Sequence, residues 1–327
     1  MRQIVPALCV GLAIATIGSA RAADGPRIVA SIKPIHSLVA AVMGDVGTPD
    51  LIVKGAGSPH AYSLRPSEAT MIDRADIVFW IGPEFEAFLD HPLDALAGTG
   101  RAVRLDGTEG LTLLDLREGG AFEAHEDDDE GSGHGEHAEA ADHDKGGEED
   151  DHGDEKNMHV WLDPGNAIAM TRRIVAELGR IAPEHGAAFR ANGAALEARI
   201  AALDQRLATD LAELRDRPFV VFHDAYHYFE SRYGLSTAAA FTVNAENAPG
   251  ARRLTEIRAR IKETGAACVF AEPQFKPEVV TSVAADAGIR SGVLDPLGAT
   301  VEPGPDAWEE IMTSLARDLR ACLGPAS

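Results

Sequence analysis

Short runs of apolar, mostly β-branched residues recur along the chain, separated by longer stretches with helical periodicity. Because nearly all internal residues of these runs are apolar, they predict strands covered on both faces. The predicted strands are 27–32, 50–54, 77–81, 159–162, 219–223, 267–271 and 292–294. Intervening stretches such as 34–43 and 255–264 suit helices. The alternation predicts an α/β fold with mainly parallel sheets flanked by helices.

One helical pattern, at 183–217, is much longer than the others. Its apolar positions are spaced by three, four or seven residues, and Pro183 and Pro218 bracket it. A helix of about 30 residues is about 45 Å long. We therefore expect a rigid linker helix that joins an N-terminal lobe (24–182) to a C-terminal lobe (218–327). An ordinary packing helix within one domain remains the alternative.

The first residues are typical of an export signal. Arg2 precedes an apolar stretch over 4–17, which is short for a membrane span, and small residues follow up to Ala23. We expect a signal peptide over 1–23, cleaved near residues 22–23, and a periplasmic mature protein that does not insert into the membrane. A retained N-terminal anchor is the alternative. About 300 residues remain, a length typical of two domains.

The net charge of −22 is concentrated in one segment. Residues 123–156 hold 16 Asp/Glu against two Lys, which leaves −8 for the rest of the chain. The segment has almost no large apolar residues, so we expect a disordered loop. Its histidines could bind divalent metals weakly, although a plain solubility loop is the alternative; they are His125, His134, His137, His143 and His152. A nucleic-acid partner is not expected, because no basic surface is indicated.

Two cysteines, Cys268 and Cys322, follow the predicted signal peptide. In an oxidising compartment two cysteines most simply form one disulfide. The alternative use, a thiolate metal site, would favour closer spacing such as C-x-x-C.

Three histidines stand at the ends of predicted strands or in the loops beyond them. His60 follows the strand at 50–54, His159 opens the strand at 159–162, and His223 ends the strand at 219–223. Asp295 likewise follows an apolar run. Ligand groups collect at such edges in open α/β sheets, and three imidazoles with a carboxylate suit tetrahedral Zn²⁺. The other histidines are weaker candidates: His36, His91, His185 and His227.

Five segments in this order resemble the zinc-type periplasmic solute-binding proteins of bacterial ABC importers, the cluster A-I (cluster 9) metal-binding family. They are GSPHAYSLRPS (57–67), HVWLDP (159–164), FHDAY (222–226), EPQF (272–275) and LDPLG (294–298). The resemblance covers nearly the whole mature chain. Ala61 departs from it, because an acidic residue commonly follows the first histidine.

The resemblance implies a Zn²⁺ carrier that is not an enzyme, with its site in the cleft between the lobes. His60, His159 and His223 would bind zinc, and the fourth ligand would be Asp295, a water molecule or another carboxylate. The partner would be the membrane permease of the importer, and the protein would act as a monomer. The alternatives are a manganese or iron carrier of the same fold, a secreted zinc hydrolase, and a metal buffer without a transporter. From the reference pKa of histidine we expect zinc affinity to fall below about pH 6.

Overall fold

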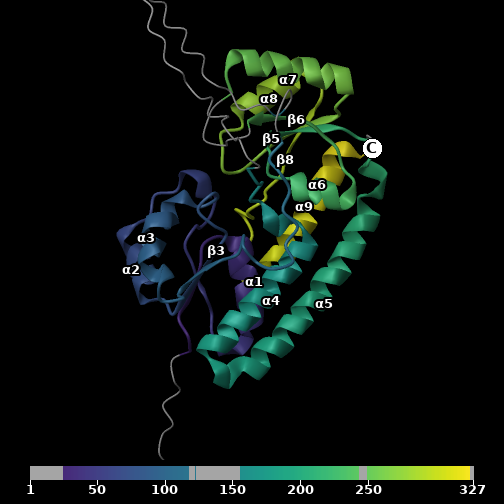
Figure 1. The fold of residues 1–327 in the computed structure, drawn as a ribbon. Helices are drawn as coiled ribbons and strands as arrows, with labels where there is room; N and C mark the ends of the chain where they lie inside the picture. Colours follow the sequence, from purple (N-terminus) through teal and green to yellow (C-terminus); the bar gives the residue numbers. More distant parts are fainter. Residues whose placement is uncertain (1–24, 118–121, 123–154, 243–248, 325–327) are drawn as a thin grey trace, which may run out of the picture.

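A computed structural model describes residues 25–117, 122, 155–242 and 249–324. Two parallel sheets of four strands form its centre (Figure 1). The first sheet has the order β2-β1-β3-β4 and the second the order β6-β5-β7-β8. The strands are β1 (Ile28–Ala30), β2 (Asp50–Leu51), β3 (Ile77–Trp80), β4 (Ala102–Arg104), β5 (Phe219–His223), β6 (Thr237–Thr242), β7 (Cys268–Ala271) and β8 (Arg290–Val293). The predicted α/β class with parallel sheets is confirmed.

Helices cover both sheets and connect their strands, as parallel pairing requires. They are α1 (Lys33–Met43), α2 (Pro66–Arg74), α3 (Ala87–Ala97), α4 (Pro164–Ile181), α5 (Gly186–Asp210), α6 (His227–Tyr233), α7 (Ala251–Thr264), α8 (Glu278–Ala287) and α9 (Ala307–Leu323). In Figure 1, α7 and α8 cover the second sheet at the top, while α1 and α4 lie in the lower half of the molecule. The central strands β3 and β5 are buried throughout, in agreement with their continuous apolar sequences.

The long predicted helix is shorter than expected. A 3-10 turn, Pro183–His185, precedes α5, which ends at Asp210, and a second turn follows at Ala212–Leu214. The helix packs along α4 and α1, and in Figure 1 it runs up one side of the molecule to α6. Its role as a rigid linker, and the lobe boundaries, stay predictions.

The C-terminal helix α9 reaches back to the first half of the chain. The backbone N–H of Trp308 donates to Ser37 Oγ at 2.9 Å, and its Nε1 donates to the carbonyl of Trp161 at 2.9 Å. Lys33 Nζ donates to the carbonyl oxygens of Gly298 and Val301 in the segment before α9. These contacts join the two halves around the segments that carry the histidines.

Several predicted elements need correction. The segment expected as a strand at 159–162 contains a 3-10 turn, Val160–Leu162, because the chain bends there to enter α4. The strands β4 and β6 were not predicted. Residues 155 and 156, expected in the disordered loop, pair with 115 and 116 through the Asp115–Lys156 bridge. The predicted disulfide between Cys268 on β7 and Cys322 on α9 is present.

Other expectations fall outside the described residues. These are the signal peptide at 1–23 and the histidines of the acidic segment, His125, His134, His137, His143 and His152. Within the described part of the chain, no helix is both long enough and apolar enough to cross a membrane.

Candidate metal centre

Three histidines are carried by segments that meet between the two sheets. His60 lies in a 3-10 turn, Pro59–Ala61, in the connection that follows β2. His159 stands directly before the turn that leads into α4, and His223 is the last residue of β5. Connections that leave the carboxyl ends of parallel strands gather at one edge of a sheet, and this brings the three segments together.

The three imidazoles form one compact group. Each offers a ring nitrogen, and these atoms all lie within 4.8 Å of one another. The ring centroid of His60 is 5.6 Å from that of His159 and 5.7 Å from that of His223. The centroids of His159 and His223 are 5.0 Å apart. The predicted convergence of these side chains is therefore present in the structure.

Asn157 orients the ring of His159. Its Nδ2 donates to the backbone carbonyl of Asp224 at 2.8 Å, which turns Oδ1 toward His159. That oxygen accepts the backbone N–H of His159 and lies 2.9 Å from its Nδ1. An amide oxygen only accepts, so the contact assigns the proton to Nδ1 and leaves a lone pair on Nε2. The sequence motif begins at His159, and for this reason Asn157 was missed.

Glu272 orients His223 in the same way. Its Oε1 lies 2.6 Å from His223 Nδ1, and both side chains are buried. A carboxylate acceptor assigns a proton to Nδ1 again, so in the neutral rings the Nε2 lone pairs of His159 and His223 face each other at 3.1 Å. A cation bound by these two nitrogens would use both lone pairs, and histidines held through their other nitrogen are typical of metal sites.

Burial favours the neutral form of two of these rings, those of His60 and His159. Burial, and to a smaller extent the neighbouring His223, lowers the pKa of His60 to about 3. Burial also holds the pKa of His159 well below its usual range, with His223 and His60 adding to the effect. Phe85 contributes an apolar wall, with its ring 4.8 Å from that of His60 and 5.2 Å from that of His159. Neutral imidazoles beside this apolar ring can bind a cation without first releasing a proton.

The donor set fits Zn²⁺ better than Ca²⁺ or Mg²⁺. Zinc accepts imidazole nitrogen and is stable with three protein ligands and a fourth from solvent or a carboxylate. Calcium and magnesium prefer oxygen ligands. Copper and nickel would also accept these nitrogens, so the donors alone do not select among the transition metals.

Asp295 is not a member of the histidine group. Its Oδ1 accepts hydrogen bonds from Gln274 Nε2 at 3.0 Å and from the backbone N–H of Gly298 at 2.9 Å. The carboxylate thus fixes the loop that follows β8. Its service as a fourth ligand stays a prediction.

The remaining described histidines lie outside the group. The Nε2 atom of His36 lies 3.0 Å from the carbonyl oxygen of Pro49, a contact that holds the turn before β2. His227 begins α6, and burial lowers its pKa. His91 lies on α3 and His185 in the turn before α5.

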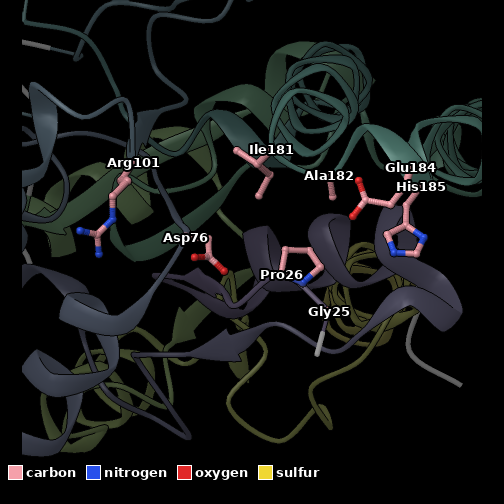
Figure 2. Close-up of a pocket in the computed structure, with 8 residues that line it drawn as sticks. All are labelled: Gly25, Pro26, Asp76, Arg101, Ile181, Ala182, Glu184 and His185. Carbon is pink, nitrogen blue, oxygen red and sulfur yellow. The ribbon is translucent and has the colours of Figure 1, made fainter. Parts of the chain in front are cut away.

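His185 also lines a separate cavity of about 430 Å³, shown in Figure 2. Pro26, Asp76 and Arg101 precede β1, β3 and β4, so this cavity lies at the amino edge of the first sheet. The histidine group lies at the opposite, carboxyl edge. Arg101 is engaged there with the carbonyl oxygens of Asp73 and Ala75. The cavity therefore has no part in the metal centre.

Comparison with protein families gives a match over residues 28–322, to ZnuA, described as zinc-uptake complex component A, periplasmic. The high-affinity zinc uptake system protein ZnuA of Brucella abortus is 45% identical over 321 residues, which cover 94% of this chain and 94% of that protein. The protein of the same name from Yersinia pestis is 36% identical over 298 residues, or 90% of this chain and 91% of that protein.

Solved structures show the same fold. A crystal structure of ZnuA has a TM-score of 0.73 at 24% identity and covers 92% of this chain and 100% of its own. The periplasmic zinc-binding protein TroA from Treponema pallidum has a TM-score of 0.74 at 18% identity, with the same coverage of 92% and 100%. At these identities the likeness concerns the fold alone, and it confirms the two-lobe architecture.

Proposed function

Because the chain belongs to the ZnuA family of periplasmic zinc-uptake components, we propose that it captures Zn²⁺ in the periplasm and delivers it to a membrane importer. The ion would be bound by the Nε2 atoms of His159 and His223 together with a ring nitrogen of His60. Zinc is then the cargo of the protein, and the chain's own work is to bind it tightly and release it at the permease.

The observation that carries this proposal is the pair of Nε2 atoms at 3.1 Å. Both Nδ1 atoms are held by acceptors, Asn157 and Glu272, so both lone pairs point into the group. A zinc ion bound by both nitrogens would use both lone pairs. His60 follows β2 of the first sheet and His223 ends β5 of the second, so the cation would be held between the two sheets.

The rest of the proposal concerns groups beyond the three histidines. Asp295 or a water molecule would complete the zinc shell. The histidines of the acidic segment would bind further zinc weakly and raise its local concentration. The protein would act as a monomer, dock on the permease of an ABC importer and carry out no catalysis.

Calorimetric titration of metal-stripped mature protein with Zn²⁺ tests the proposal. We expect one tight site, weakened at least a hundredfold by each of His60→Ala, His159→Ala and His223→Ala. His91→Ala, on the outer helix α3, is the matched control and should bind zinc as the natural chain does. Tight binding that persists in all three variants would show that the metal site is elsewhere.

Two further measurements separate the alternatives. Competition with Mn²⁺ and Fe²⁺ should leave zinc bound, because three nitrogen ligands favour zinc over manganese and iron. Preferential manganese binding would support a manganese carrier instead. Turnover of ester, peptide or phosphate substrates by the zinc-loaded protein would support a hydrolase.

A further inference from the structure

Residues 114–117, which precede the acidic segment, and residues 155–157, which include its last two residues, form a defined structure that we call the base. The backbone N–H of Leu116 donates to the carbonyl of Glu155 at 2.8 Å, and that of Asn157 donates to Leu114 at 2.8 Å. An antiparallel bridge joins Asp115 to Lys156, and their side chains form an ion pair. The base therefore joins residues 114–117 to residues 155–157.

The base is docked on α6 and on the end of β5. Tyr228 Oη donates to the carbonyl of Asn157 at 2.7 Å and accepts the backbone N–H of Leu114 at 3.0 Å. The side chain of Asn157 donates to the carbonyl of Asp224, the residue after His223. Through Asn157, the base thus contacts both the His159 ring and the backbone beside His223.

Arg117, in the 114–117 half of the base, forms ion pairs with two acidic residues. Its Nε donates to Asp224 Oδ2 at 2.9 Å, and its Nη1 donates to Glu230 Oε2 at 2.8 Å. Asp224 is 1% exposed and Glu230 is 4% exposed, so neither carboxylate has solvent to stabilise its charge. The planar guanidinium meets both acids with its fork of donors, an arrangement that lysine cannot reproduce.

We propose that Arg117 is a positioning residue for the metal centre. It fixes the Asp224 carboxylate, and Asp224 fixes both the end of β5 at His223 and, through its carbonyl, the amide of Asn157 that orients His159. Two of the three zinc-binding rings would then depend on one arginine that touches neither of them. This inference rests on the proposed function, because it assigns Arg117 to the same zinc site.

A second arginine, Arg199, also pairs with two carboxylates, but it lies away from the metal centre. Arg199 pairs with two acids, Asp306 and Glu309, and links α5 to α9. Its partners contact none of the three histidines in the described structure. Arg199 is therefore a control for loss of an arginine that bridges two carboxylates away from the metal centre, at a more exposed position.

The test compares Arg117→Lys, Arg117→Met and Arg199→Met in the full mature chain. Zinc affinity is measured by competition with a chelating dye, folding by urea unfolding of the metal-free protein, and site geometry by the visible spectrum of the Co²⁺-loaded protein. Arg117→Lys keeps the charge that the buried acids require, so it remains informative if Arg117→Met does not fold.

We expect Arg117→Lys to weaken zinc binding about tenfold to a hundredfold, the range typical of residues that orient metal ligands, and to alter the Co²⁺ spectrum. Arg199→Met should leave both unchanged. Zinc affinity within twofold of the natural chain and an unaltered Co²⁺ spectrum in Arg117→Lys would overturn the inference, as would an equal loss in Arg199→Met. The proposed function fails separately, when the natural chain has no tight site or the histidine variants keep it.

Discussion

Glu272 Oε1 lies 2.6 Å from Nδ1 of His223, and both residues are buried at the ends of neighbouring strands β7 and β5. The carboxylate holds the ring with its Nε2 toward the other histidines. A carboxylate behind a metal-binding histidine also makes the imidazole a stronger donor to the metal. The pair therefore links a residue outside the ligand set to zinc affinity.

Replacing Glu272 should weaken zinc binding, and the loss should be larger when the hydrogen-bond acceptor is removed together with the charge. Glu272→Gln keeps an oxygen acceptor for Nδ1 but loses the charge, so we expect a loss of about tenfold. Glu272→Ala loses the acceptor as well, and about a hundredfold loss is expected. Competition titration with a chelating dye measures both. Glu278→Gln on the exposed start of α8 is the control, and equal affinities for all the variants would contradict the assigned role of Glu272.

The metal-free protein should lose stability as the pH falls from about 6.5 toward 3. In the unfolded chain His60 takes up a proton near pH 6.5, whereas in the folded chain its pKa is about 3. The unfolded state binds more protons across this window, so stability rises with pH there. Between pH 7.5 and pH 5 the expected loss is at most about 2 kcal/mol from His60. His159, whose pKa is also lowered, acts in the same direction.

Urea unfolding of the metal-free protein at pH 7.5, 6 and 5 measures this loss, and His60→Ala should show a shallower pH dependence. At His60, the same pKa moves the expected competition between protons and zinc from about pH 6 to lower pH. Protons compete with zinc for His60 only near pH 3, because burial disfavours the charged ring. NMR of the His60 ring should show it neutral at pH 5, and a titration midpoint near 6 would contradict the assigned burial effect.

Two helical glycines should respond in opposite ways to alanine. A Cβ on Gly193 of α5 would meet Val175 Cγ2 of α4 at 2.5 Å, so Gly193→Ala overpacks the contact and should cost about 1–3 kcal/mol. A Cβ on Gly179 of α4 would meet nothing within 4 Å, so Gly179→Ala should gain up to about 1 kcal/mol from helix propensity. Urea unfolding compares them, and a gain in both would show that α4 and α5 separate easily.

Sequence patterns predicted the buried strands best. The run at 219–223 is apolar up to its final histidine, and β5 has the same bounds. By contrast, β6 has the sequence TAAAFT, and its three alanines favour helix over strand, so burial between neighbours decides its structure. The three residues of β4 are too few for a periodicity to appear.

The candidate site was predictable only in part. The positions of His60 and His223 beyond strand ends predicted their meeting, because parallel strands end at a common edge. His159 reached the site through a turn instead of a strand. No sequence pattern predicts the roles of Asn157 and Arg117, because both depend on contacts with Asp224. This residue is 67 positions from Asn157 and 107 positions from Arg117 along the chain. Asp295 illustrates the converse, since the sequence could not show that its oxygens accept bonds from its own loop.

The disulfide should stabilise the fold without contributing to zinc binding. It joins Cys268 to Cys322 across 54 residues, and in the chain-entropy account a loop of this size is worth about 4 kcal/mol. Cys268→Ala with Cys322→Ala should therefore lower the free energy of unfolding by about that amount, measured in urea. The natural chain in reductant should match the variant, because both lose the same constraint. Zinc affinity should stay within about threefold, since neither sulfur belongs to the histidine group. A large loss of affinity would mean that the β7–α9 connection also sets the position of Glu272 at the end of β7.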